Sequence, residues 1–206
     1  MCGKVAKVPR KSRPAVDIIS PELLLQGYRL GVFPMGMTDG SIHWFSPDPR
    51  AILPLDGFKT DHGLRRVLAK KKFEIKIDKS FGEVIRACAD REETWITPKI
   101  IASYEHLHDL GCAHSVEAWH NEKLAGGLYG VAIGGAFFGE SMFHRVTDAS
   151  KVALVGLVEI MKARRFVLLD TQWSTPHLEK FGAAEISRRA YLRLLARAVE
   201  LKRSLI

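Results

Sequence analysis

Cysteine is scarce in this 206-residue sequence, and long apolar runs are missing from it. The three cysteines, Cys2, Cys88 and Cys112, are scattered and odd in number, which argues against a disulfide framework and indicates a reducing compartment. No apolar run reaches the length of a membrane span, and the basic first residues lack the apolar core of a secretory signal. We therefore expect a cytoplasmic protein with no membrane partner.

Several catalytic motifs are also missing. The sequence has no Gly-x-Ser-x-Gly elbow, no phosphate-cradling lysine loop and no dinucleotide fingerprint, and no cysteine lies in a nucleophile signature. The histidines and the cysteine between residues 106 and 120 look superficially like a metal site. However, His106 and His108 are two residues apart on a predicted helix and point to different faces. We therefore expect no bound metal.

What the sequence does contain is positive charge. Its 47% hydrophobic and 26% charged residues are typical of a globular protein, whereas the net charge of +8 favours a polyanionic partner or else serves solubility alone. The densest basic cluster lies on a predicted amphipathic helix over residues 61–72. Its members are Arg65, Arg66, Lys70, Lys71 and Lys72. This cluster is the candidate site for phosphate contacts, with a merely solvated helix face as the alternative.

Composition divides the chain into three regions. Residues 1–16 form a basic arm that we expect to be disordered, because it is short of apolar residues and contains two prolines. Residues 17–57 form a small, loop-rich N-terminal domain, with a helix that begins after its N-cap Ser20 and a rigid, proline-containing loop over residues 43–50. Residues 58–206 form the larger, catalytic domain.

The hydrophobic pattern of the larger domain alternates between helical and strand periods. It predicts strands over residues 73–77, 115–119, 128–133, 136–142 and 166–169, and helices over residues 61–72, 81–89, 98–110, 149–162, 177–180 and 187–202. Gly134-Gly135 is the predicted turn of a central hairpin, because glycine tolerates the positive φ angles of primed turns. The order predicts an α+β fold with a mixed, mainly antiparallel sheet flanked by helices.

This order of elements resembles that of the Gcn5-related acyltransferases. Those enzymes bind the pyrophosphate of coenzyme A on glycine-rich backbone amides at the start of the helix that follows the hairpin. In this sequence the same place, residues 143–150, contains no glycine. The resemblance therefore implies an acyltransferase-like domain without the coenzyme, and we expect no cofactor.

One carboxylate stands at the end of the central hairpin. Glu140 lies among Phe137, Phe138, Met142 and Phe143, where an unpaired buried charge is costly. It therefore needs a cationic partner, which is either a substrate or a structural arginine. A surface position at a strand end is the remaining interpretation.

The end of the last apolar strand carries a second pair of polar residues. Asp170 and Gln172 are two residues apart, hence on the same side of an extended segment, and are able to converge on one reacting group. The alternative is that Asp170 caps a neighbouring helix. Spacing alone favours that alternative.

A resemblance to a known family changes this weighting. The motifs that carry it occur in order and with close spacing between residues 17 and 195. They are Phe33-Pro34, Trp44-Phe45-Ser46-Pro47-Asp48-Pro49-Arg50, Thr94-Trp95-Ile96, His114-Ser115-Val116-Glu117, Gly126-Gly127-Leu128-Tyr129-Gly130-Val131, Gly139-Glu140-Ser141-Met142-Phe143, Ala149-Ser150-Lys151 and Asp170-Thr171-Gln172. With these motifs the sequence resembles the leucyl/phenylalanyl-tRNA:protein transferases.

The resemblance implies an aminoacyltransferase that moves Leu, Phe or, less well, Met from aminoacyl-tRNA to the N-terminal Arg or Lys of a protein, which marks that protein for degradation. By resemblance, Asp170 holds and polarises Gln172, whose carbonyl orients or deprotonates the attacking amine. Glu140 then binds the cationic acceptor. The donor side chain is expected in an apolar slot formed by Leu128, Phe137, Leu154, Leu157 and Leu169.

By the same resemblance, the terminal adenosine of the tRNA is expected at Trp95, Met35 and Tyr28. The family commonly has Trp where Met35 stands, so Trp95 becomes the main aromatic platform. Thr171 replaces a usual Cys, and the Gly-Gly-Asp-Leu segment that often precedes the first helix is absent. These departures concern the adenosine pocket more than the reaction.

Two other function classes stay open at this point. One is a coenzyme A-dependent N-acetyltransferase on the same fold, which acetyl-coenzyme A binding would identify. The other is a non-catalytic RNA-binding or peptide-binding module, which tRNA affinity without transfer would identify. For the transferase we expect a monomer.

Overall fold

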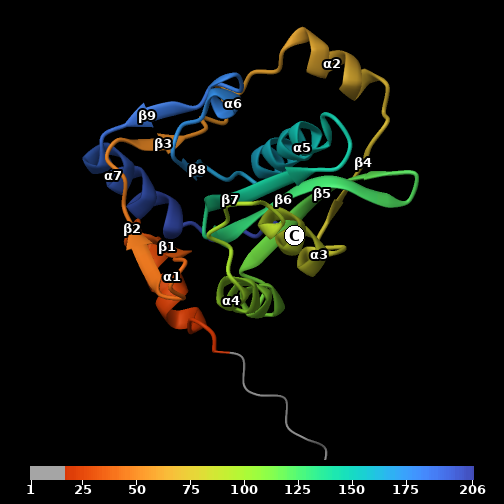
Figure 1. Cartoon of the computed structure of the whole chain (residues 1–206). Coiled ribbons are helices and arrows are strands. Elements are labelled where there is room, and N and C mark those ends of the chain that lie inside the picture. Colours follow the sequence, from red (N-terminus) through yellow and green to blue (C-terminus); the bar gives the residue numbers. More distant parts are fainter. Residues whose placement is uncertain (1–16) are drawn as a thin grey trace, which may run out of the picture.

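The computed structural model describes residues 17–206 (Figure 1). The helices are α1 Pro21–Arg29, α2 His62–Ala69, α3 Phe81–Ala89, α4 Pro98–Asp109, α5 Ala149–Ala163, α6 Pro176–Glu179 and α7 Arg188–Val199. The strands are β1 Phe33–Gly36, β2 Ile42–Phe45, β3 Arg50–Ile52, β4 Glu74–Ile77, β5 Ala113–His120, β6 Lys123–Ile133, β7 Ala136–His144, β8 Leu168–Gln172 and β9 Ala184–Ile186. The basic arm expected over residues 1–16 lies outside the described residues.

A seven-stranded sheet forms the centre of the molecule. Its strand order is β4-β5-β6-β7-β8-β3-β9, and β7 and β8 run parallel whereas every other neighbouring pair is antiparallel. A separate two-stranded sheet pairs β1 with β2. The expected α+β fold, with a mixed and mainly antiparallel sheet flanked by helices, is therefore confirmed.

Two apolar cores lie on the two faces of this sheet. On one face, α1, α3, α4 and α7 contribute buried side chains to a core that includes Tyr28, Ile100 and Leu195. On the other face, α5 packs with α2 and the segment around Phe181. Figure 1 shows α5 on the opposite side of the sheet from α3 and α4. Within residues 17–206, no helix combines the length and the apolar character that a bilayer crossing requires.

The helix-start signals in the sequence act as expected. The side chains of Ser20 and Thr97 accept hydrogen bonds from the backbone N–H groups of Leu23 and Ile100, which caps α1 and α4 ahead of a proline in the first turn. Asp61 caps α2 in the same way, with Leu64 as the donor. Local capping chemistry therefore fixes where these helices begin.

The central hairpin also forms where the sequence predicts it. Residues Gly134 and Gly135 connect β6 and β7, and Gly134 lies at φ 58°, while Gly135 lies outside the left-handed region. The pairing register shifts at Tyr129 and Gly130, which marks a β-bulge. Gly126 lets α5 approach the sheet, since a Cβ there would lie 2.7 Å from the Cβ of Ala149.

The parallel pairing of β7 with β8 is short. It runs from Ala136 opposite Leu168 to Phe138 opposite Asp170, and the following residues of the two strands are unpaired with each other. Glu140 and Gln172 therefore lie just beyond the last paired residues. This divergence of two central strands creates the space that the candidate site occupies.

Short strands were missed by the sequence analysis. The segment expected to be a loop, residues 43–50, includes most of β2 and the first residue of β3, and only residues 46–49 are irregular. Strand β1 lies before it. The strand expected over residues 166–169 begins at Leu168 and extends to Gln172, and β9 has only three residues. Because β3 pairs with β8 and β9, the N-terminal region contributes a strand to the large sheet. The domain boundary at residue 57 stays a prediction.

Candidate active site

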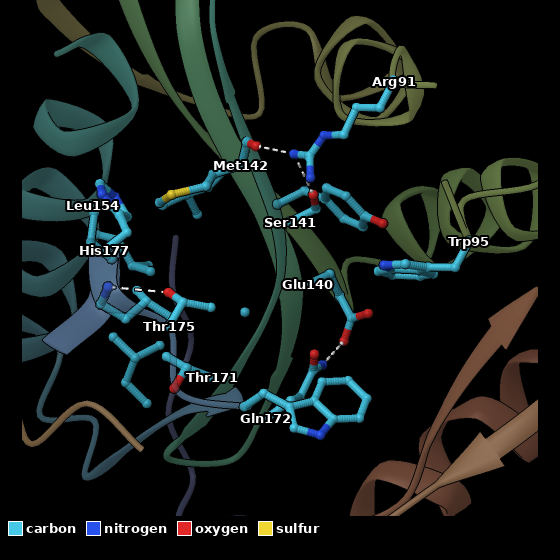
Figure 2. A pocket seen from close by; sticks show the side chains of 17 residues that line it. Arg91, Trp95, Glu140, Ser141, Met142, Leu154, Thr171, Gln172, Thr175 and His177 are labelled. Atoms are coloured by element: carbon cyan, nitrogen blue, oxygen red, sulfur yellow. Dashed lines mark hydrogen bonds between the residues drawn. The ribbon is translucent and has the colours of Figure 1, made fainter. Parts of the chain in front are cut away.

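A cavity of about 300 Å³ opens where β7 and β8 diverge (Figure 2). Its polar wall contains Glu140 from β7 and Gln172 from β8. Trp95, which belongs to the loop before α4, also lines the cavity. The apolar wall is formed by Leu128, Met142, Leu154, Leu157, Leu169 and Leu178. The cavity is thus polar on one side and apolar on the other.

Glu140 is 8% exposed, and its partners are uncharged. Its Oε1 accepts hydrogen bonds from the Tyr28 hydroxyl at 2.7 Å and from Nε2 of Gln172 at 2.8 Å, and Oε2 accepts one from the Tyr104 hydroxyl at 3.5 Å. Among residues 17–206, no cationic side chain lies within ion-pair distance of Glu140. The expectation of a structural arginine partner is therefore wrong, because two tyrosines and an amide occupy that place.

This environment changes the pKa of Glu140. Burial raises that pKa to about 7, and the negative charge of Asp170 acts in the same direction, whereas the hydrogen bonds from Tyr28 and Gln172 lower it. Burial also raises the pKa values of Tyr28 and Tyr104 well above the ordinary tyrosine value, so both hydroxyls stay protonated. Glu140 therefore titrates near neutral pH between two neutral hydroxyls.

Asp170 does not face the cavity, although Gln172 does. The Asp170 side chain is fully buried and accepts hydrogen bonds from Nε and Nη2 of Arg50, at 2.9 and 2.6 Å, and from the Tyr191 hydroxyl at 2.6 Å. Its remaining contact is with the backbone N–H of Gln172 at 2.9 Å. The expectation that both side chains converge on one reacting group is wrong, because Asp170 is saturated by protein partners. The contact with the backbone of Gln172 agrees with the expectation, drawn from the resemblance, that Asp170 holds Gln172.

Gln172 has an unusual backbone conformation for its residue type. Its φ angle is 66°, which lies in the left-handed region that disfavours residues with a Cβ. The Asp170 carboxylate that accepts from its backbone N–H stabilises this conformation. The side chain then donates from Nε2 to Glu140, which leaves its carbonyl oxygen available to a ligand (Figure 2). The fold thus strains the backbone at the residue expected to contact the amine.

Arg50, for which the sequence motifs predicted no role, is the buried partner of Asp170. It is 1% exposed, and its guanidinium lies over the rings of Phe33 and Tyr191 at 4.8 and 4.5 Å. It also donates to the carbonyl of Gly31 at 3.2 Å. In the sequence, Arg50 is marked only by its position as a single charged residue between Pro49 and a short apolar run. Spacing does not reveal its partner, which lies 120 residues away along the chain.

Four of the five residues expected in the donor slot lie together on the apolar wall. They are Leu128, Leu154, Leu157 and Leu169, and the structure adds Met142 and Leu178. Phe137 is fully buried in the core that these leucines share, so no part of it reaches the cavity surface. Its placement in the slot is therefore wrong.

The three residues expected at the adenosine are separated. Trp95 lines the cavity, whereas Met35 on β1 packs against the neighbouring core and does not line it. Tyr28 is 1% exposed with its hydroxyl on Glu140, so it offers no free ring face to a base, and that expectation is wrong. Trp173, which the sequence analysis missed, lines the cavity, is 42% exposed and packs edge-on against Phe33 at 5.0 Å.

Three buried polar atoms on the cavity wall have no hydrogen-bond partner among residues 17–206. They are the Tyr129 hydroxyl, Oγ1 of Thr171 and Nε2 of His177. Buried polar groups are normally satisfied, and exceptions need an explanation. Each of these atoms is itself inaccessible to solvent, so it lies behind the cavity surface and offers no contact to a ligand in the cavity.

The expected basic cluster lies on the surface away from this wall. All five members are exposed on α2 or directly after it, and Arg65 donates to the backbone carbonyl of Thr60 at 2.9 Å. Helix α2 packs on α5, whose residues Leu154 and Leu157 line the cavity.

The histidines between residues 106 and 120 have partners of other kinds: His114 contacts Asp78 at 2.7 Å and the ring of His108 stacks on Phe81.

Comparison with known proteins identifies the family. Residues 52–196 match the sequence profile of the family described as leucyl/phenylalanyl-tRNA protein transferase, and residues 17–48 match that of its N-terminal domain. Relatives named leucyl/phenylalanyl-tRNA–protein transferase from Salinibacter ruber and Akkermansia muciniphila are each 55% identical to this chain. The first alignment covers 89% of this chain and 82% of the relative, and the second covers 89% and 98%.

Solved structures are more distant. L-PGS from Bacillus licheniformis aligns with a TM-score of 0.46 at 12% identity, over 87% of this chain and 70% of that one. A GCN5-related N-acetyltransferase-like protein from Streptococcus suis aligns with a TM-score of 0.37 at 14% identity, over 66% and 58% of the two chains. The assignment therefore rests on the sequence matches.

These matches define an aminoacyltransferase, an enzyme that moves an aminoacyl group from one substrate to another. The chain belongs to the leucyl/phenylalanyl-tRNA–protein transferase family.

The buried Arg50–Asp170 pair predicts a large loss of stability when one partner is removed. Arg50→Ala leaves the Asp170 charge buried, which costs about 3 to 5 kcal/mol of unfolding free energy. The matched control is Arg86→Ala, because Arg86 pairs with Glu105 on the surface and an exposed pair contributes at most about 1 kcal/mol. Urea unfolding followed by circular dichroism measures both, and equal losses would contradict a special role for the buried pair.

Proposed function

We propose that this protein transfers Leu, Phe and, less efficiently, Met from aminoacyl-tRNA to the N-terminal Arg or Lys of proteins, and that the new N-terminus marks them for degradation. The observation that carries the proposal is Glu140, a buried carboxylate with uncharged partners that borders an apolar cavity. A cationic acceptor supplies the opposite charge that residues 17–206 do not provide. The protein acts in the cytoplasm as a monomer.

The donor ester is already activated, so the enzyme mainly has to align two substrates. The leucine-rich wall suits an unbranched or γ-branched apolar side chain. A β-branched donor side chain is wider at its Cβ. A misfit of this size in an apolar pocket typically costs about 1 to 3 kcal/mol of binding free energy, so such donors are disfavoured. The apolar wall therefore selects the donor, and the polar wall selects the acceptor.

Gln172 lies beside Glu140 on the polar wall. Its Nε2 donates to Glu140, so its carbonyl oxygen accepts a hydrogen bond from the attacking amine and orients it toward the ester. A neutral amide is a weak base, whereas the carboxylate of Glu140, with a pKa of about 7, is able to accept a proton near neutral pH. In this mechanism Gln172 aligns the amine and Glu140 binds the cation.

The proposal is tested by incubation of the protein with radiolabelled Leu-tRNA and a protein that bears N-terminal Arg. A second acceptor that differs only in carrying N-terminal Glu serves as the control. Label transfer to the first acceptor alone supports the proposal. Equal label on both acceptors, or none on either, contradicts it.

Glu140→Gln is expected to weaken the use of N-terminal Arg and Lys by about tenfold or more, since it removes a charge-assisted contact of about 1.5 to 3 kcal/mol. In the wild type, acceptor kcat/KM rises with pH through about 7, because the charged carboxylate is the form that binds a cation. The variant loses this inflection and keeps the one near pH 8 that belongs to the acceptor α-amine.

Glu117→Gln is the matched control for this variant, since Glu117 is fully buried and hydrogen-bonded on β5 and does not line the cavity. The affinity of Glu140→Gln for aminoacyl-tRNA is expected to equal that of the wild type. Unchanged acceptor kinetics in this variant would remove Glu140 from the acceptor site.

Gln172→Ala is expected to slow single-turnover transfer by up to about a hundredfold, because a misaligned amine loses near-attack geometry. Gln172→Glu does not rescue the rate. In the wild type, Nε2 of Gln172 donates to Glu140 at 2.8 Å, and the variant replaces this donor by a second carboxylate that repels Glu140. Rapid-quench measurements at saturating substrates report both rates. Gln26→Ala, on the exposed face of α1, is the control.

Recovery of the Gln172→Glu rate as pH rises would indicate that proton removal, rather than alignment, limits the reaction. A wild-type rate in Gln172→Ala would return this residue to a structural role.

The basic cluster on α2 is expected to bind the phosphates of the tRNA acceptor stem. Replacement of Arg65, Arg66, Lys70 and Lys71 by Ala flattens the dependence of log affinity on log salt, since each phosphate contact contributes about 0.9 to that slope for B-form duplexes. The control variant replaces Arg189, Arg193, Arg197 and Lys202, which removes the same formal charge from another exposed surface. Equal slopes in the two variants would show that α2 acts through net charge alone.

A further inference from the structure

Arg91 is the only arginine or lysine among the described residues that line the cavity. It lies two residues after the end of α3 and four residues before Trp95, so both reach the cavity from one short connection. Its side chain is exposed to solvent. Arg91 thus places a permanent positive charge at the opening of the cavity, and the other described lining residues include no arginine or lysine.

The contacts of Arg91 fix its direction. Its Nη2 donates to Oγ of Ser141 at 3.2 Å and to the backbone carbonyl of Met142, which ties the guanidinium to β7 (Figure 2). No carboxylate among residues 17–206 forms an ion pair with it, whereas the neighbouring Arg86 and Arg145 pair with glutamates at 2.8 and 2.6 Å. Arg91 is therefore oriented but not neutralised.

A second hollow of about 410 Å³ adjoins the cavity and shares Arg91 and Met142 with it. Its other walls include Asp90, Phe143, His144 and Arg145. Asp90 is the one acid there, and the guanidinium of Arg145 lies 5.5 Å from the ring centre of Phe143. Arg145 is paired with Glu83 and Phe143 is largely buried, so Arg91 is the unpaired arginine of this hollow among the described residues.

The chemistry of an aminoacyl-tRNA determines what lies at this opening. The amino acid is esterified to the ribose of the terminal nucleotide, and the same ribose carries a phosphate on its 5′ oxygen. When the aminoacyl group occupies the cavity, this phosphate lies within one nucleotide of the opening. Arginine matches phosphate well, because its planar fork donates two parallel hydrogen bonds.

We propose that Arg91 binds the 5′-phosphate of the terminal nucleotide of the donor, and that the adjoining hollow takes the nucleotide before it. This inference rests on the proposed function, in which the cavity holds the aminoacyl group. Arg91 is then a binding residue that places the ester relative to Gln172. It is distinct from the basic cluster on α2, which acts on the duplex.

The test uses two minimal donors: leucine esterified to the 3′ oxygen of adenosine, and leucine esterified to the 3′ oxygen of adenosine 5′-monophosphate. The wild type uses the phosphorylated donor more efficiently. Arg91→Gln lowers kcat/KM for that donor by about tenfold, since one charge-assisted contact is lost, and leaves the unphosphorylated donor unchanged. Arg91→Lys, which keeps the charge without the fork, lies between them. Arg86→Gln, on the outer surface of α3, changes neither value.

Full-length Leu-tRNA gives a second readout. The slope of log affinity against log salt decreases by about 0.7 in Arg91→Gln, the value for one phosphate contact on a single strand. Equal use of the two minimal donors by the wild type, or equal losses on both donors in Arg91→Gln, would overturn the proposal. Equal losses would indicate that Arg91 only braces β7 through Ser141 and Met142.

The two proposals fail in different ways. If the wild type transfers leucine from none of the three donors, the proposed function fails. If the wild type transfers leucine and Arg91→Gln behaves like it on every donor, only the assignment of Arg91 fails.

Discussion

The buried ion pair between Arg50 and Asp170 is the interaction on which the site depends. Taking both charges out of water is costly, and the cost is offset only because each charge is surrounded by further partners. Asp170 accepts from Tyr191 and from the backbone of Gln172, while Arg50 lies between two aromatic rings. The pair joins the N-terminal β3 to β8 near the C-terminal end of the chain. It thereby fixes the end of β8, where the cavity begins.

This arrangement separates the environments of two nearby carboxylates. Asp170 has a full cationic partner and is occupied by the protein, whereas Glu140 has only hydroxyl and amide donors and a pKa of about 7. Environments that differ in this way give similar groups different tasks. Gln172 connects them, since its backbone donates to one carboxylate and its side chain to the other.

The sequence predicted the elements whose signals are local. Ser20 and Thr97 cap helices that begin where expected, and the glycine pair turns the central hairpin. Short strands were missed because three or four residues, with a proline in β1, give no usable period. A pattern that short is decided by its partner strand, which the local sequence does not specify.

The site was predicted in the same uneven way. Glu140, Gln172 and four leucines of the donor slot do lie around one cavity, and the family resemblance, not spacing along the chain, predicted that these residues of β6, β7, α5 and β8 come together. The partner of Asp170 was not predictable, since a contact across 120 residues has no spacing signature. Tyr28 and Phe137 were misplaced for a related reason: the sequence shows that a ring is present but not how deeply the fold buries it.

In the proposed mechanism, the charges around the cavity also distinguish its two substrates. A cationic acceptor is attracted to Glu140 and repelled by Arg91, whereas a donor phosphate experiences the opposite preferences. Like-charge contacts penalise a wrong orientation, so in the proposed mechanism Arg91 and the ionised form of Glu140 favour opposite placements of donor and acceptor. In the mechanism proposed here the apolar wall selects the donor side chain, and the fixed charges orient the two reactants so that amine and ester meet at Gln172.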